Sequence, residues 1–237
     1  MYHILPFISL YDGGIPLKKN KDTKHSNKTM EPELAAILEN EMEANRYAAR
    51  CLIVCAIVGV LAWLLNIIGI FIVPHRIMDI SMPLLILSFL LPTPIYKITG
   101  GKPGWVKYVT IFCVTLGVFI LSSAMPKHGI LAWALPLLLS CHYYSKRLTQ
   151  LTLLASWVLF SSSVYIGMYF GEGDLNLLAE HDVVGIRTVT DDMLHYATIF
   201  YVVPRALILL GLSSICTMMA GRTRDSICCI WPVLLKI

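Results

Sequence analysis

Arg205 is the residue whose type and position most directly suggest chemistry. It follows Pro204 in the apolar stretch YVVPRALILLGL and is the one charged side chain well inside that stretch. If a helix begins at Tyr196, Arg205 lies about 13 Å from its start at 1.5 Å per residue. A guanidinium in hydrocarbon is costly, so we expect it to face other helices and to contact an anionic or carbonyl partner. It could bind an anionic stimulus or form a latch to a carboxylate such as Asp79.

A second interpretation of Arg205 is equally open. Its long side chain could extend outward to lipid phosphate and have no specific role. Replacement of Arg205 by Met separates the two, because unchanged assembly and response would exclude a sensing role.

Potential metal ligands lie in an acidic segment before the last apolar stretch. Asp191 and His195 are four residues apart in DDMLH, and EHD contains Glu180, His181 and Asp182. Carboxylate and imidazole groups at this spacing can share a helix face and bind a divalent cation. No HExxH-type spacing is present, so the pattern favours a solvated acidic loop and no metal site is predicted. Asp191 and His195 remain candidates for contact with a stimulus.

The motifs of several enzyme classes are absent from the sequence. There is no GxxxxGK[ST] phosphate loop, no GxSxG elbow and no zinc-finger spacing. We therefore expect no catalytic residues, no cofactor and no nucleic-acid partner. None of the predicted spans holds Asp or Glu deep in its interior, which disfavours a proton-coupled carrier.

The elements that would position these residues are apolar segments of membrane-spanning length. The chain is 57% hydrophobic and 14% charged, against about 25% charged in soluble domains. About 20 apolar residues in a helix cross the roughly 30 Å hydrocarbon layer. The sequence predicts an all-α polytopic membrane bundle of about six helices: 51–73, 77–96, 106–125, 130–144, 148–170 and 196–220. The fourth is short and contains Pro136.

The basic residues predict the orientation. One side of the predicted membrane would carry nine Lys and Arg residues, and the other would carry Arg76, Lys127 and Arg187. The positive-inside rule then places both termini in the cytoplasm. The acidic loop 171–195 lies outside under the same assignment. An even number of spans agrees with this arrangement.

The terminal segments differ from the membrane domain at 48–221. Residues 1–29 contain the basic run KKNKDTKHSNK and are expected to be a disordered tail that is foreign to the rest, with Met30 as an alternative start. Residues 30–47 are predicted to form a cytoplasmic lead-in helix, either a simple lead-in or a helix that pairs with a partner subunit or with the C-terminal extension. Residues 222–237 form a short stub, interpreted as an interfacial tail or as the scar of a truncation.

Three stretches carry a resemblance: EANRYAARCLIVCAIVGVLAWLLNIIGIFIV, LAWALPLLLSCHYYSKRLTQLTLLASWVLF and YVVPRALILLGLSSICTMMAGRTRD. The chain resembles the membrane-sensing N-terminal half of clostridial signalling proteins over about residues 43–225. In that family a six-helix module precedes a cytoplasmic output domain, often a diguanylate cyclase of the GGDEF type. No GGDEF motif follows here, so the resemblance implies a sensor module without its effector and no catalytic residue to carry over.

Two functional classes remain open at this point. The first is the sensory or anchoring part of a bacterial signal-transduction protein in the cell membrane, in contact with the lipid bilayer and with a homodimer as one option. The alternative is the substrate-binding membrane subunit of a small-solute, vitamin-type transporter. A third option is that the chain has no function. We expect Arg205 and the 171–195 loop to take part in sensing, and the Arg222–Arg224 end to carry output.

Overall fold

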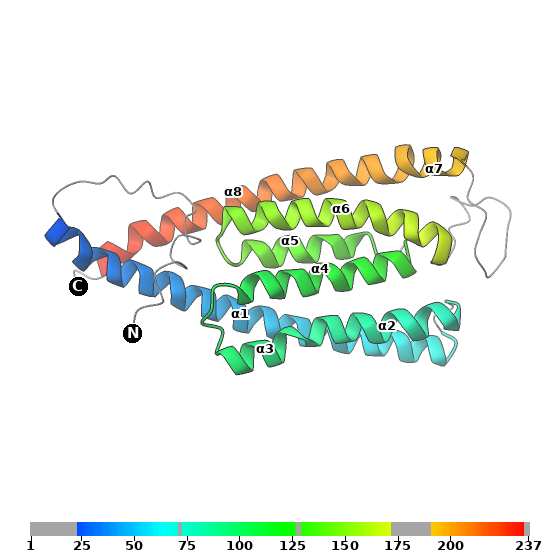
Figure 1. Ribbon diagram of the computed structural model, residues 1–237, viewed down its shortest axis with the longest axis horizontal. Helices are drawn as coiled ribbons and strands as arrows, with labels where there is room; N and C mark the ends of the chain where they lie inside the picture. The colour runs from blue at the N-terminus through cyan, green and yellow to red at the C-terminus, as the bar shows by residue number, and fades with distance from the viewer. Residues whose placement is uncertain (1–22, 71–72, 127–128, 172–190, 235–237) are drawn as a thin grey trace.

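The protein folds into a bundle of long helices that run roughly along one axis (Figure 1). The structure, a computed structural model, describes residues 23–70, 73–126, 129–171 and 191–234, with the side chains of 23–37, 192 and 222–234 left out. No strand occurs in these ranges. The helices are α1 (Thr23–Ile67), α2 (His75–Leu90), α3 (Pro92–Thr99), α4 (Val106–Ala124), η2 (Leu131–Trp133), α5 (Ala134–Cys141), α6 (Lys146–Phe170), α7 (Asp191–Ala197), η3 (Thr198–Val202) and α8 (Val203–Leu234).

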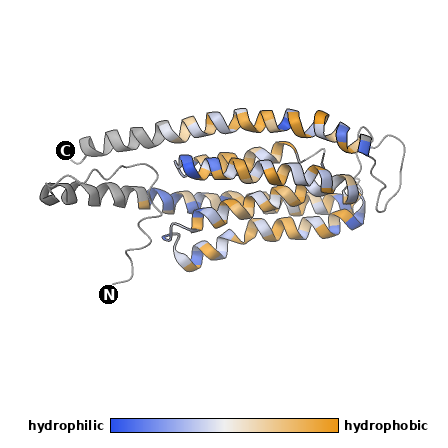
Figure 2. Ribbon diagram, turned by 45° about the horizontal axis from the view of Figure 1, so that its top comes forward, coloured by the Kyte–Doolittle hydropathy of each residue, from blue (hydrophilic) through white to orange (hydrophobic). Residues whose placement is uncertain are grey.

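Five of these segments are long and apolar enough to cross a membrane: Leu38–Ile67, His75–Thr99, Val106–Ala124, Lys146–Phe170 and Met193–Gly221. Hydrophobic residues cover the length of the helices, and hydrophilic residues gather at the two ends of the bundle (Figure 2). The protein is thus an all-helical bundle of the multi-pass membrane type. The fourth predicted span is shorter than expected, because Leu131–Cys141 is all the helix that the structure places there.

The predicted lead-in helix is continuous with the first span. α1 begins at Thr23 and runs for 45 residues without a break, so the helix begins before the predicted start at residue 30. The helix also begins within the segment that composition predicts to be disordered. It ends near Asn66, whose side-chain Oδ1 accepts a 2.9 Å hydrogen bond from the Val73 amide and closes the turn into α2.

Helix α4 lies at the centre of the bundle. Of its most apolar stretch 56% is buried, against 22% for α1 and α8. It packs against α2 on one side and α6 on the other. α6 presents a face of small residues, which allow close approach between membrane helices. The buried members of that face are Thr149, Thr152, Ser156, Ser163 and Gly167.

The start of α1 and the end of α8 lie at the same end of the bundle and extend beyond it (Figure 1). The Lys146 side chain at the start of α6 lies beside Gly221 of α8. α8 therefore leaves the bundle near Gly221 and continues as a helix to Leu234.

Candidate functional site

Arg205 lies directly after an irregular helical segment. Thr198–Val202 forms a π-helix between α7 and α8, and the Val203 amide donates to the Thr198 carbonyl, five residues back. Pro204 explains the irregularity, because proline has no amide hydrogen and its ring clashes with the carbonyl four residues earlier. Widening the turn relieves that clash. Segments of this kind are frequent at functional sites.

A second contact holds the π-helix in place. The Thr198 hydroxyl donates to the Leu194 carbonyl at 2.7 Å and also lies 2.9 Å from the Tyr165 hydroxyl of α6. Since the Thr198 hydrogen is used in the first bond, the Tyr165 hydroxyl donates in the second. The π-helix is thereby tied to α6 on one side and leads into Arg205 on the other.

The Arg205 side chain lines a small cavity between η2, α6 and α8. Its walls are Ile130, Trp133, Phe160, Arg205, Ile208 and Leu209. The volume is about 40 Å³, enough for a water molecule or a small ion. Drug-sized ligands occupy pockets of roughly 300 Å³ or more, so this cavity has no room for a molecule as large as a vitamin.

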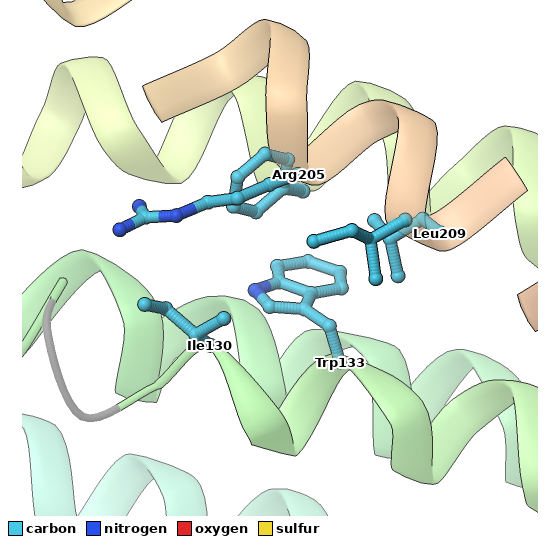
Figure 3. A pocket seen from close by; sticks show the side chains of 6 residues that line it. Ile130, Trp133, Arg205 and Leu209 are labelled. Carbon is cyan, nitrogen blue, oxygen red and sulfur yellow. The ribbon is translucent and has the colours of Figure 1, made fainter. Parts of the chain in front are cut away.

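Two of the side chains that line this cavity carry N–H donor groups, Trp133 and Arg205. Figure 3 shows the guanidinium of Arg205 and the indole nitrogen of Trp133 on the same side, above Ile130. Trp133 is 1% exposed, and its Nε1 has no hydrogen-bond partner in the described part of the chain. The Trp133 ring packs edge-on against Phe160 with centroids 5.7 Å apart. The Arg205 guanidinium carbon lies 4.3 Å from the centre of the Tyr201 ring, a cation–π contact.

The structure does not bring Arg205 and Asp79 together. Asp79 lies on α2, on the opposite side of the bundle from α8 (Figure 1). It is exposed, and its Oδ1 accepts a 2.9 Å hydrogen bond from Trp63 Nε1 of α1. The role of Asp79 here is to join α1 to α2.

Asp191 and His195 both lie on α7 and are exposed. No group of three or more His, Cys, Asp or Glu side chains that could hold a metal occurs among the residues searched, which are the described ones. Glu180, His181 and Asp182 lie outside the described residues, as does most of the acidic loop.

A buried polar network lies at the other end of the bundle. Lys107 Nζ of α4 and Glu41 Oε1 of α1 form an ion pair of 2.5 Å, and each side chain is 9% exposed. One turn along α1, Asn45 Nδ2 donates to the Gly101 carbonyl at 3.0 Å. The Tyr143 hydroxyl donates to Asn45 Oδ1 at 2.9 Å. One face of α1 thus contacts α4, the turn at Gly101 and the segment after α5 that contains Tyr143.

Sequence reasoning missed this network. In the sequence Lys107 counts only among the nine basic residues on one side of the predicted membrane. In the structure the buried face of α1 at this level holds Glu41 and Asn45, while Leu38 is 37% exposed. Glu41, Asn45 and Ala48 are spaced four and three apart, so a helical face that mixes polar and small residues is the pattern that could have revealed it.

The arrangement places a small, largely apolar cavity beside Arg205 at one end of the bundle and a buried polar network at the other. Comparison with known proteins gave no match: no family model fits the chain, and no curated protein or solved structure is similar to it.

Proposed function

We propose that this protein is a membrane sensory and anchoring module of a bacterial signal-transduction protein, with α8 as the transmitting helix. The observation that carries the proposal is the continuity of α8. One helix runs from Val203, beside the Arg205 cavity, to Leu234, beyond the end of the bundle. A displacement of α8 beside the cavity would also displace its far end, because a continuous helix moves as a stiff rod over this length.

The π-helix is one of the two arrangements that such coupling requires, and a regular α-helix at the same residues would be the other. Conversion of Thr198–Val202 to a regular α-helix would remove one residue from the turn. α8 would then move by about 1.5 Å and rotate by about 100° relative to α7. The Tyr165–Thr198 hydrogen bond stabilises the π-helical state. A ligand that moves Arg205 would change the balance between the π-helical and the α-helical state.

The orientation in the membrane follows from charge. Lys146 and Arg147 begin α6, and Lys146 lies beside Gly221, near which α8 leaves the bundle. Arg46 and Arg50 flank Tyr47 of α1, whose ring packs against His142 just before α6. By the positive-inside rule this end faces the cytoplasm. The cavity then lies in the outer half of the membrane, and the end of α8 lies where a cytoplasmic partner can read its position.

Distance measurements between two spin labels test the proposal in the full chain reconstituted in lipid vesicles. The labels replace Met218 on α8 and Leu151 on α6, which are 67% and 46% exposed. We expect Pro204→Ala to shift the distance distribution by several Å, because it allows a regular helix at the π position. Pro83→Ala is the control, since Pro83 lies inside α2. An unchanged distribution in Pro204→Ala would contradict the proposal.

A further inference from the structure

Two cysteines from different helices meet inside the bundle. Cys141 is the last residue of α5, and Cys216 lies on α8. Their thiols are in hydrogen-bonding contact with each other, and the Thr149 hydroxyl of α6 contacts the Cys141 thiol. Both are free thiols, with Cys216 buried and Cys141 partly buried. The packing of three helices thus holds two sulfur atoms together that are far apart in the chain.

A pair of adjacent thiols is a donor set for a soft metal ion. Thiolate sulfur favours Cu(I), zinc and iron–sulfur clusters. Zinc takes three or four protein ligands, and no group of three or more His, Cys, Asp or Glu side chains that could hold a metal occurs among the described residues. Cu(I) differs, because two thiolates in a line satisfy this soft monovalent ion. Cu(I) is therefore the ion that suits the pair.

The surroundings of the two thiols also suit this ion. Cys216 belongs to the main buried cluster of the bundle, and Cys141 packs against that cluster, so bulk water is kept away from the sulfur atoms. A Cu(I) ion with two thiolates has one negative charge. Lys146 lies beside Gly221 of α8, which is about 7.5 Å along the helix from Cys216 at 1.5 Å per residue. A positive charge is thus near enough to offset it, and the Thr149 hydroxyl can donate to the Cys141 thiolate.

We propose that Cys141 and Cys216 bind one Cu(I) ion as a two-coordinate complex that bridges α5 and α8. Two Cu–S bonds form, the two thiol protons leave to water, and no electron is transferred. The ion enters from the side of Cys141, which is the partly exposed partner. This inference stands apart from the proposed signalling role, because the ion is bound whether or not α8 transmits anything.

A copper titration of the purified full chain tests the proposal. Ala first replaces Cys51, Cys55, Cys228 and Cys229, so that only positions 113, 141 and 216 keep a cysteine. This background chain, in an uncharged detergent, competes for Cu(I) with a coloured chelator in the absence of oxygen, with ascorbate to keep the copper monovalent. We expect the chain to take one ion from the chelator. No uptake would overturn the proposal and would leave the thiols as small hydrophobic side chains.

Further variants of the background chain assign the ion to the pair. Cys141→Ala and Cys216→Ala each remove a direct ligand. Loss of a group that merely orients a ligand costs about 10–100-fold in metal affinity, so either variant should bind at least about 100-fold more weakly. Cys113→Ala is the matched control, because Cys113 is also a buried free thiol, and it should keep the full affinity. Equal affinity in the background chain and in Cys216→Ala would overturn the proposal.

A second measurement covers the case in which either Ala variant fails to fold. It uses the background chain itself, which keeps both ligands, loaded with one equivalent of Cu(I). X-ray absorption at the copper edge should show two sulfur neighbours and no nitrogen or oxygen neighbour. A nitrogen neighbour, such as His142 next to Cys141 would supply, or a third sulfur would contradict a site made of these two thiols.

Discussion

Removal of the positive charge from the Glu41–Lys107 ion pair should destabilise the protein more than any surface substitution. Lys107→Met keeps most of the aliphatic side chain but leaves Glu41 without its cationic partner in a site where each side chain is 9% exposed. A carboxylate in such a place must either stay charged without compensation or take up a proton. Both alternatives raise the free energy of the folded state but not that of the unfolded chain, so the protein becomes less stable.

The magnitude follows from the burial of the pair. Breaking a buried ion pair by removal of one partner typically lowers the free energy of unfolding by about 3–5 kcal/mol. For a chain of this size, 1 kcal/mol corresponds to roughly 2–4 °C in Tm. We therefore expect Lys107→Met to lower Tm by about 10 °C. The double variant Glu41→Gln/Lys107→Met should lose less, because no charge stays buried.

Thermal unfolding can be followed with a thiol-reactive fluorophore, since Cys113 and Cys216 are buried and become reactive when the bundle opens. The control is Lys102→Met, which removes an exposed Lys in the turn before α4 and should change the free energy of unfolding by less than about 0.5 kcal/mol. If Lys107→Met melts within 2 °C of the wild-type chain in this assay, the pair is not the buried clasp described above.

Two further predictions concern the same end of the bundle. Tyr143→Phe removes the donor to Asn45 Oδ1 and should lower the free energy of unfolding by about 1–3 kcal/mol in the fluorophore assay, because the Asn45 oxygen stays buried and unpaired; no loss would show that water replaces the hydroxyl. Gly101→Ala should also lower the free energy of unfolding, since Gly101 has φ +69° and an added Cβ would lie 2.6 Å from Tyr96 Cε2. Gly211→Ala is the matched control, because an added Cβ there has nothing within 4 Å. It should leave the free energy of unfolding unchanged or raise it by up to about 1 kcal/mol. Equal melting temperatures for these two Ala variants would contradict that reasoning.

The fold was predictable where it depends on solvation of local sequence. The third and fifth spans were predicted at 106–125 and 148–170, and the helices are Val106–Ala124 and Lys146–Phe170. A long apolar run partitions into hydrocarbon whatever packs against it, so these two spans can be predicted without knowing which helices they contact. The start of α1 was less predictable, because Thr29 and Pro32 resemble a helix start, yet the helix continues through them from Thr23.

The polar network and the cavity beside Arg205 depend on contacts between residues far apart in the chain, which local sequence patterns do not predict. The hydrogen bonds and ion pair of the polar network join residues 56, 66 and 98 positions apart. Arg205 stood out in the sequence because a lone charge in an apolar helix is unusual. Trp133, which lines the same cavity, did not stand out, since tryptophan is expected near membrane interfaces and the orientation of its N–H depends on packing. The π-helix was likewise hidden, although Pro204 was its cause.

The shortness of the fourth predicted span has a consequence for the surrounding lipid if that segment also crosses the membrane. Helices η2 and α5 span Leu131–Cys141, which at 2.0 and 1.5 Å per residue is about 18 Å. A typical hydrocarbon layer is roughly 30 Å thick. Beside this segment, acyl chains must compress or headgroups and water must sink inward to meet its ends. The bilayer is therefore expected to be dimpled next to α5, and its thickness would influence how much energy the protein needs to change shape.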